Sequence, residues 1–281
     1  MDPRLTLAGP GLAALELEGL VRADRFAPTR PMRCVLPAAA IRRSPDDAAE
    51  QMDQLLFGEA FDVLQPVQGF AWGQARRDGY VGFVDTAALA EGPPAPTHQV
   101  SAPRAYAFDE PSIKARPAGL YSMNALVEIE ARDGRFAKAR DTGWFVETQL
   151  SPIGLYQTDI AAVAERYVGA AYQWGGRESL GLDCSGLVQQ AHFACGLSCQ
   201  RDTDLQARMG APIEAGDLRR GDLVFWRGHV GMMLDEARLI HANAHHMAVV
   251  IEPLAEAVAR IAATPAGEPT GYRRVVGADL F

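Results

Sequence analysis

The sequence predicts a multidomain chain in which two small all-β units precede an α+β domain. Between residues 32 and 151, short alternating apolar stretches are separated by Gly, Asp and Pro turns, a pattern typical of small barrels. Residues 184–196 (CSGLVQQAHFACG) carry apolar side chains at helical spacing and stop at a glycine. Strand-like segments follow this helix. A length of 281 residues fits one to three domains.

The domain boundaries follow the changes in composition. We expect an N-terminal extension over residues 1–31, a first β-unit over 32–92 and a second over 97–151. The proline-rich link 92–96 (GPPAP) separates the two β-units. The α+β domain is expected over residues 156–281.

The most informative residue is Cys184, which stands where the glycine-rich loop 175–181 runs into the predicted helix. Free N–H groups and the helix dipole at a first turn favour an anion, and such a site lowers a cysteine pKa. The same N–H groups could hold the oxyanion of a tetrahedral intermediate. A buried structural thiol is the alternative, and it suits Cys195 and Cys199 better than Cys184. We therefore expect Cys184 to be a nucleophile.

A thiol nucleophile needs a base, and the base needs an orienting group. Four segments around the two candidate histidines read as neighbouring antiparallel strands: 222–226, 229–234, 238–242 and 248–251. His229 begins one of them and His241 lies in the next. The pattern predicts that these histidines lie side by side, with Cys184 facing His229.

These residues lie in motifs that resemble the NlpC-type cell-wall peptidases, which are papain-like cysteine enzymes that cleave peptidoglycan stem peptides. The resemblance runs from about Ile160 to Val276. The motifs occur in the family's order: 172–176 (YQWGG), 183–187 (DCSGL), 221–225 (GDLVF), 229–231 (HVG) and 240–242 (IHA).

The resemblance implies a role for each residue at a matching position. Cys184 is then the nucleophile, His229 the general base and acid, and His241 the residue that orients His229. Tyr172 is implied to place its hydroxyl near the oxyanion hole, although simple packing beside Trp174 would also explain it.

The two β-units are similar to the bacterial SH3-like domains that accompany this family. The expected fold is therefore two small all-β SH3-like barrels followed by an α+β papain-like cysteine peptidase domain. The barrels could target the chain to cell-wall material, or the first could restrict the substrate cleft. In the second case Glu59 and Tyr80, with Asp183, are implied to hold a free peptide amino terminus through charge-assisted hydrogen bonds. For Glu59, a solvated turn residue is an equal alternative.

Two further substrate contacts are implied. Ser185 could donate to a substrate carboxylate or carbonyl. Thr203 matches a substrate-binding hydroxyl in related enzymes, although Gln200 replaces the family's usual proline. The pair Thr203 and Gln206 also has the spacing of a helix capping box, and both roles could hold.

The formal charge of −8 argues against nucleic acid and anionic membrane surfaces as partners. A small soluble peptide is easier to reconcile with it. We expect the four cysteines to be reduced thiols. Zinc is a minor alternative, because Cys195, Cys199, His241, His245 and His246 supply ligand types without a standard spacing. No cofactor and no metal are expected.

No signal peptide is visible, since Glu16 and Glu18 interrupt the only N-terminal apolar run. The sequence contains no stretch of 18 or more apolar residues that could span a membrane. The expected location is cytoplasmic, or exported if a leader precedes this sequence.

The resemblance implies a γ-D-glutamyl-L-diamino-acid endopeptidase of the dipeptidyl-peptidase VI type. Its substrate would be a murein stem peptide, L-Ala-γ-D-Glu-diamino acid, with a free N-terminal L-Ala, in murein peptide recycling. Two alternatives remain: a papain-like amidase or acyltransferase on another substrate, and a catalytically inactive wall-binding protein.

Overall fold

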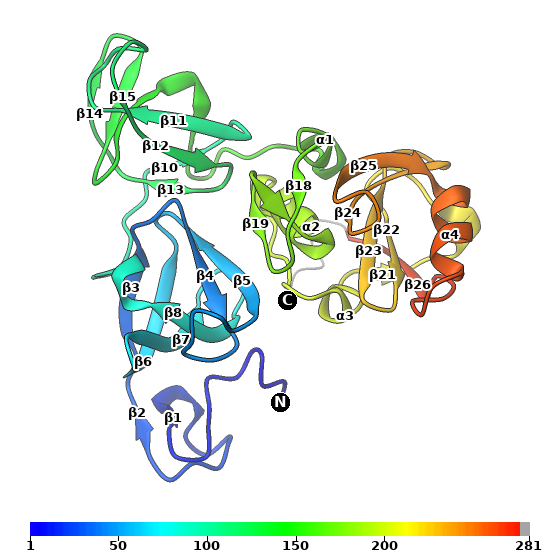
Figure 1. The fold of residues 1–281 in the computed structure, drawn as a ribbon, viewed down its shortest axis with the longest axis horizontal. Coiled ribbons are helices and arrows are strands. Elements are labelled where there is room, and N and C mark those ends of the chain that lie inside the picture. The colour runs from blue at the N-terminus through cyan, green and yellow to red at the C-terminus, as the bar shows by residue number, and fades with distance from the viewer. Residues whose placement is uncertain (276–281) are drawn as a thin grey trace. The chain divides into compact units, whose positions relative to one another are not determined.

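The computed structural model of the chain describes residues 1–275. It divides into two compact units, Met1–Ile153 and Gly154–Phe281 (Figure 1). The end of the predicted catalytic domain, residues 276–281, and Val276, where the family resemblance ends, lie outside the described residues.

The first unit opens with short elements and then forms an antiparallel sheet around its own apolar core. The opening elements are β1 (Ala13–Ala14), η1 (Leu15–Leu17) and β2 (Phe26–Ala27). The sheet order is β5 (Gln51–Leu56), β4 (Ala38–Arg42), β8 (Val81–Asp85), β7 (Phe70–Ala75), β6 (Ala60–Val67), β3 (Arg30–Cys34) and β9 (Leu89–Glu91), and η2 (Thr86–Ala88) connects β8 to β9. Buried side chains that alternate along these strands, among them Ile41, Phe61 and Val84, form the core.

The second β-region of this unit has two small antiparallel sheets and a second core. One sheet has the order β12 (Pro117–Ser122), β11 (Arg104–Phe108), β16 (Gly143–Val146), β15 (Phe136–Ala139) and β14 (Ile129–Asp133). The other joins β13 (Leu126–Val127), β10 (His98–Val100) and β17 (Leu150–Pro152), and η3 (Glu147–Gln149) precedes β17. Val100, Tyr121 and Phe145 are buried at the centre of this core.

The two β-regions interlock through the turn after β5. Phe57 belongs to the second core, with its ring 5.2 Å from that of Tyr121, and its carbonyl accepts from the N–H of Leu126. At Gly58 the backbone has a φ of +77°, and a Cβ would lie 2.1 Å from the Leu126 carbonyl oxygen. A side chain is therefore excluded there both by conformation and by space.

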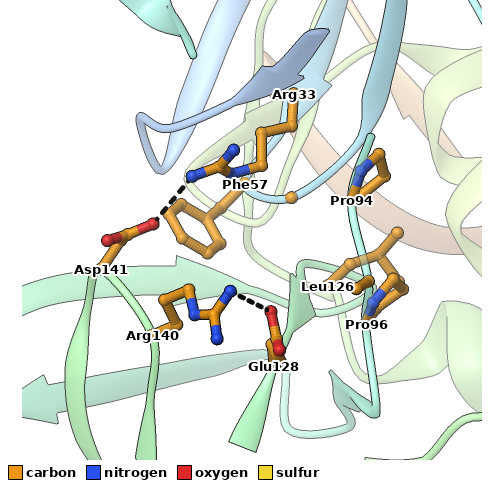
Figure 2. A pocket seen from close by; sticks show the side chains of 10 residues that line it. Arg33, Phe57, Pro94, Pro96, Leu126, Glu128, Arg140 and Asp141 are labelled. Atoms are coloured by element: carbon orange, nitrogen blue, oxygen red, sulfur yellow. Dashed lines mark hydrogen bonds and ion pairs between the residues drawn. The ribbon is translucent and has the colours of Figure 1, made fainter. Parts of the chain in front are cut away.

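The proline-rich link passes beside this contact. In Figure 2, Pro94 and Pro96 lie near Phe57 and Leu126, and together these side chains line a small pocket. Arg33 bonds Asp141 at 3.1 Å across the two β-regions. The link therefore joins two packed modules and is no free spacer.

The second unit packs helices against one long mixed sheet. The helices are α1 (Ile160–Glu165), α2 (Cys184–Ala194), α3 (Thr203–Gln206) and α4 (Leu254–Ala262), and η4 (Ala215–Asp217) follows α3. The sheet order is β19 (Arg177–Glu178), β20 (Gly181–Leu182), β18 (Ala171–Tyr172), β25 (Ala248–Pro253), β24 (Arg238–Asn243), β23 (His229–Met233), β22 (Leu223–Trp226), β26 (Gly271–Arg274) and β21 (Ala211–Pro212). Helix α2 is buried along its length and packs against β23 and β24.

The main elements expected in this unit are confirmed. The predicted helix is α2, and its predicted stop, Gly196, has a φ of +71°. The four predicted strands are β22 to β25, which pair antiparallel in sequence order. None of the helices described over residues 1–275 is long and apolar enough to cross a membrane.

Candidate active site

Cys184 lies at the first position of α2, as the sequence predicts. The preceding Asp183 is the N-cap, and its side chain accepts from the N–H of Gly186 at 2.8 Å. Gly186 is required because a Cβ there would lie 2.3 Å from the carbonyl oxygen of Gly176. The motif 183–186 therefore starts the helix, caps it and lets the glycine-rich loop approach it closely.

The Asp183 carboxylate is at the centre of a buried polar network. One oxygen accepts from Arg201 at 2.9 Å, from the Ser185 hydroxyl at 3.1 Å and from Gly186. The other accepts from Arg201 at 2.6 Å and from the N–H of Gly175 at 2.9 Å. Arg201 is 1% exposed. This bidentate ion pair ties the loop before α2 to the segment after it.

Ser185 and Thr203, the two other predicted substrate contacts in this unit, have different settings. Ser185 is buried and its hydroxyl also accepts from Arg201 at 2.8 Å. Thr203 is half-buried at the first position of α3, where Asp202 is the N-cap.

The capping-box interpretation of Thr203 is wrong. The Gln206 amide instead donates to the carbonyls of Ser185 and Gln200, at 3.0 and 2.8 Å. The Gln206 side chain therefore joins the segment before α3 to helix α2 and does not cap its own helix.

The Cys184 thiol lies buried against the start of β23. The backbone N–H groups of Val230 and Ser185 bond the sulfur and, with the charge of Arg201, lower its pKa. Burial, with a smaller contribution from Asp183, outweighs them and raises the thiol pKa to about 12. The expectation of a lowered pKa is therefore wrong for the free site: here burial outweighs the helix N-terminus.

The two histidines are brought together as predicted. Nε2 of His229 lies 2.8 Å from Nδ1 of His241. His241 is fully buried in β24, and its Nε2 lies 2.6 Å from an oxygen of Glu252 on β25. The same oxygen accepts a hydrogen bond from Arg260, in the last turn of α4. The ring of Trp226 packs beside His229, with centroids 5.6 Å apart.

Both imidazoles are held neutral in the free site. Burial, followed by the neighbouring His241 and by Arg260, lowers the pKa of His229 to about 3, while Glu252 and Asp183 oppose the shift. Burial, with Arg260 and His246, lowers the pKa of His241 to about 3. A neutral thiol beside a neutral imidazole reacts by passing its proton to the base as the sulfur attacks.

Tyr172 ends β18 and belongs to the same site. Burial raises the pKa of its phenol, and the proximity of Cys184 and then Asp183 raises it further. The hydroxyl therefore stays protonated and can donate a hydrogen bond next to the nucleophile. Over residues 1–275, no group of three or more His, Cys, Asp or Glu side chains could hold a metal ion, and all four cysteines are free thiols.

Glu59 and Tyr80 lie in the first unit. Glu59 is buried in the turn between β5 and β6, where it accepts from Arg77 at 2.9 Å and from the N–H of Leu56 at 3.0 Å. The interpretation of Glu59 as a solvated turn residue is therefore wrong. Tyr80 is buried in the first β core.

Sequence reasoning missed three charged residues of this region. Arg201 lies in the polar stretch 200–204 (QRDTD), where nothing predicts that its side chain is buried against Asp183. Glu252 lies two residues beyond Val250, which faces His241 across the β24–β25 pair. Strand alternation places it on the His241 side. Nothing in the sequence places Arg260 against Glu252.

A buried thiol starts a helix and is bonded by the backbone N–H of Val230, and the preceding residue, His229, belongs to a hydrogen-bonded histidine pair. This combination is typical of a cysteine-nucleophile hydrolase. The model of the NlpC/P60 family matches residues 169–264. That of the bacterial dipeptidyl-peptidase Sh3 domain matches residues 41–89.

Individual relatives agree with these matches. A probable endopeptidase NlpC homologue of Haemophilus influenzae is 31% identical over 127 residues, or 43% of this chain and 69% of that protein. The γ-D-glutamyl-L-lysine dipeptidyl-peptidase of Bacillus subtilis is 27% identical over 217 residues, or 72% of each protein. The fold resembles the crystal structure of a Bacillus cereus NlpC/P60 protein, with a TM-score of 0.74 and 19% identity over 87% of this chain and 99% of that one. The chain belongs to the NlpC/P60 family of cysteine peptidases.

Proposed function

We propose that this protein is a cysteine endopeptidase that hydrolyses the γ-D-Glu–diamino acid bond of peptidoglycan stem peptides. The proposal rests on the placement of Cys184 at the start of α2, where its sulfur is bonded by the N–H of Val230, the residue that follows His229 in β23. His229 in turn bonds His241. The substrate is inferred from the Bacillus subtilis relative, which is named for γ-D-glutamyl-L-lysine.

The residues of the site support a two-step reaction. The sulfur of Cys184 attacks the γ-carbonyl carbon of D-Glu while its proton moves to His229. The C–N bond then breaks, and the amine of the diamino acid takes that proton. Water attacks the resulting thioester and gives one proton to His229. The C–S bond breaks, the sulfur regains the proton, and L-Ala-γ-D-Glu leaves as the acid.

Hydrogen-bond donors are available for the oxyanion that develops on the γ-carbonyl oxygen. The N–H of Ser185, in the first turn of α2, bonds the Cys184 sulfur, and Tyr172 keeps its hydroxyl proton near Cys184. Donors that are already in place when charge develops lower the barrier without reorganisation. We therefore assign Tyr172 to the oxyanion hole.

Recognition of a free N-terminal L-Ala is the finer part of the proposal. An ammonium group at Asp183 would share the carboxylate with Arg201, because both oxygens already accept from that guanidinium. We propose Asp183, Glu59 and Tyr80 as the residues that hold the amine, with Ser185 and Thr203 contributing hydroxyl groups. Each of these assignments stays a prediction.

Two wider assignments are also proposals. We infer that the second β-region is a second SH3-like module, because its short antiparallel strands enclose a core of their own. We propose that the protein acts in the cytoplasm on peptides released during murein recycling, since its formal charge of −8 gives no long-range attraction to anionic wall polymers.

The test compares stem peptides with free and blocked amino termini. L-Ala-γ-D-Glu-L-Lys is expected to yield L-Ala-γ-D-Glu and lysine, identified by mass spectrometry. The Nα-acetyl peptide is expected to react at least about 100-fold more slowly, because it lacks the ammonium group that forms charge-assisted hydrogen bonds with the carboxylates. The same pair should be run with diaminopimelate in place of lysine.

Equal cleavage of the free and acetylated peptides would reject the amine site while leaving the peptidase. Cleavage of neither, with transfer or hydrolysis of another amide or ester, would replace the proposed substrate by that of an amidase or acyltransferase. Retention on insoluble peptidoglycan without any turnover would instead favour a wall-binding protein.

A further inference from the structure

Beyond the two histidines, the site continues into a buried chain of hydrogen bonds that ends on a fixed charge. His229 bonds His241, His241 bonds Glu252, and Glu252 bonds Arg260. The three distal residues come from β24, β25 and α4, so the chain crosses from the sheet to a covering helix. Such an arrangement has a direction, because each neutral imidazole has one donor nitrogen and one acceptor nitrogen.

The direction of these hydrogen bonds is set by Arg260, whose guanidinium cannot act as an acceptor. Arg260 can only donate, so the Glu252 oxygen that it contacts is an acceptor. The same oxygen lies 2.6 Å from Nε2 of His241, which must then carry the proton. Nδ1 of His241 is left as an acceptor for Nε2–H of His229, 2.8 Å away.

We propose that Glu252 and Arg260 are positioning residues that set the tautomer of His229, leaving its Nδ1 unprotonated to serve as the base for Cys184. The proposal deepens the proposed peptidase function and rests on it for the kinetic readout. With the opposite tautomer, Nδ1 of His229 would carry a proton and could not accept one from the thiol. Loss of the correct tautomer is a recognised route to large losses of activity in hydrolases that use a histidine base.

The hydrogen-bonded residues also balance charge when His229 takes up a proton. On taking the Cys184 proton, His229 becomes a cation whose Nε2–H still donates to His241. Glu252 stabilises that cation through His241, and Arg260 limits the stabilisation. No proton needs to reach Glu252 at any step, so the carboxylate acts through geometry and charge alone.

The packing around these hydrogen bonds favours a fixed tautomer of His229. His241 is fully buried and the Glu252 side chain is 12% exposed. Trp226 shields His229 on one side. Because little water reaches the bonds, their direction is fixed by protein groups and their charges are weakly screened.

The decisive measurement is the ¹⁵N NMR spectrum of the full-length protein labelled at histidine, with His229 assigned by substitution. We expect a protonated Nε2 and an unprotonated Nδ1 at neutral pH. Glu252→Gln should keep this tautomer, because the amide oxygen can still accept from both Arg260 and His241. Glu252→Ala should give a mixture of tautomers. A protonated Nδ1 in the unmodified protein would overturn the proposal.

The pH dependence of kcat/KM distinguishes positioning residues from residues with a purely structural role. Charged and titratable groups that act on His229 are Asp183, His241, Glu252 and Arg260, and His246 acts on His241. Removing a cation favours the protonated imidazole, so Arg260→Met should shift the acid limb of kcat/KM to higher pH. Removing an anion disfavours it, so Glu252→Gln should shift the limb to lower pH.

Matched variants separate these effects from misfolding. Arg260→Lys should restore the unmodified acid limb, and Glu252→Ala should lower kcat about 10- to 100-fold with little change in KM. Shifts of the acid limb in the same direction for Arg260→Met and Glu252→Gln would contradict the proposal. If no variant and no unmodified protein turns over the peptide, the proposed function fails, while the NMR tautomer still decides this inference.

Discussion

Replacing Cys184 by alanine is expected to abolish hydrolysis of L-Ala-γ-D-Glu-L-Lys, with kcat reduced about 10⁴-fold or more. The alanine cannot attack the γ-carbonyl carbon or form the thioester, so the covalent route is lost. The helix should remain, because the N-cap Asp183 and its bond to Gly186 are untouched. Turnover is measured by mass spectrometry of the released dipeptide and lysine.

Cys195→Ala is the matched control for this variant. Cys195 follows the last residue of α2, about 16 Å along the helix from Cys184. It should retain the turnover of the unmodified protein. Undiminished cleavage by Cys184→Ala would contradict the assignment of the nucleophile.

Replacing Arg201 by methionine is expected to destabilise the catalytic unit by about 3 to 5 kcal/mol. The variant leaves the buried Asp183 carboxylate without the guanidinium that bonds both of its oxygens. Because Asp183 caps α2, the loss should appear first in that helix. Hydrogen exchange of the amides of residues 184–194, read by mass spectrometry, measures the free energy of opening locally.

Arg238→Met is the control for the loss of an arginine ion pair. Arg238 bonds Asp235 at 2.7 Å with its side chain 57% exposed. Such surface pairs contribute about 0 to 1 kcal/mol. Similar losses of protection in α2 for both variants would mean that the buried network does not stabilise the site in the way described.

Much of the catalytic unit could be predicted from its sequence because local signals agree there. The apolar spacing after Cys184 and the stop at Gly196 define a helix within one segment. The strands that carry His229 and His241 have β-branched and apolar runs divided by turn residues. Antiparallel pairing of consecutive strands then brings the two histidines together with no long-range information.

What could not be predicted depends on how separate elements pack against one another. Arg260 reaches Glu252 only because α4 packs back over the sheet. The Gln206 side chain donates to the carbonyl of Ser185 on another helix, a contact that the spacing of Thr203 and Gln206 does not reveal. The raised pKa of Cys184 has the same origin, since burial is a property of the whole unit.

The first unit shows the same limit. The sequence predicts two β-units and a proline-rich divider, but not that Phe57 of the first segment completes the core of the second region. Nothing in the sequence around a single aromatic residue in a turn indicates which core its side chain will join. The Glu59–Arg77 pair is likewise made by residues on separate strand ends.

The role of Cys184 as the nucleophile for this substrate is tested most directly with an L-Ala-γ-D-Glu peptide that ends in a chloromethyl ketone. The electrophile places a reactive carbon where the scissile bond would lie. Digestion and mass spectrometry should find one label per chain, on Cys184, together with complete loss of hydrolysis. Labelling of Cys34, Cys195 or Cys199 instead, or full hydrolysis after Cys184 is labelled, would show that Cys184 is not the nucleophile.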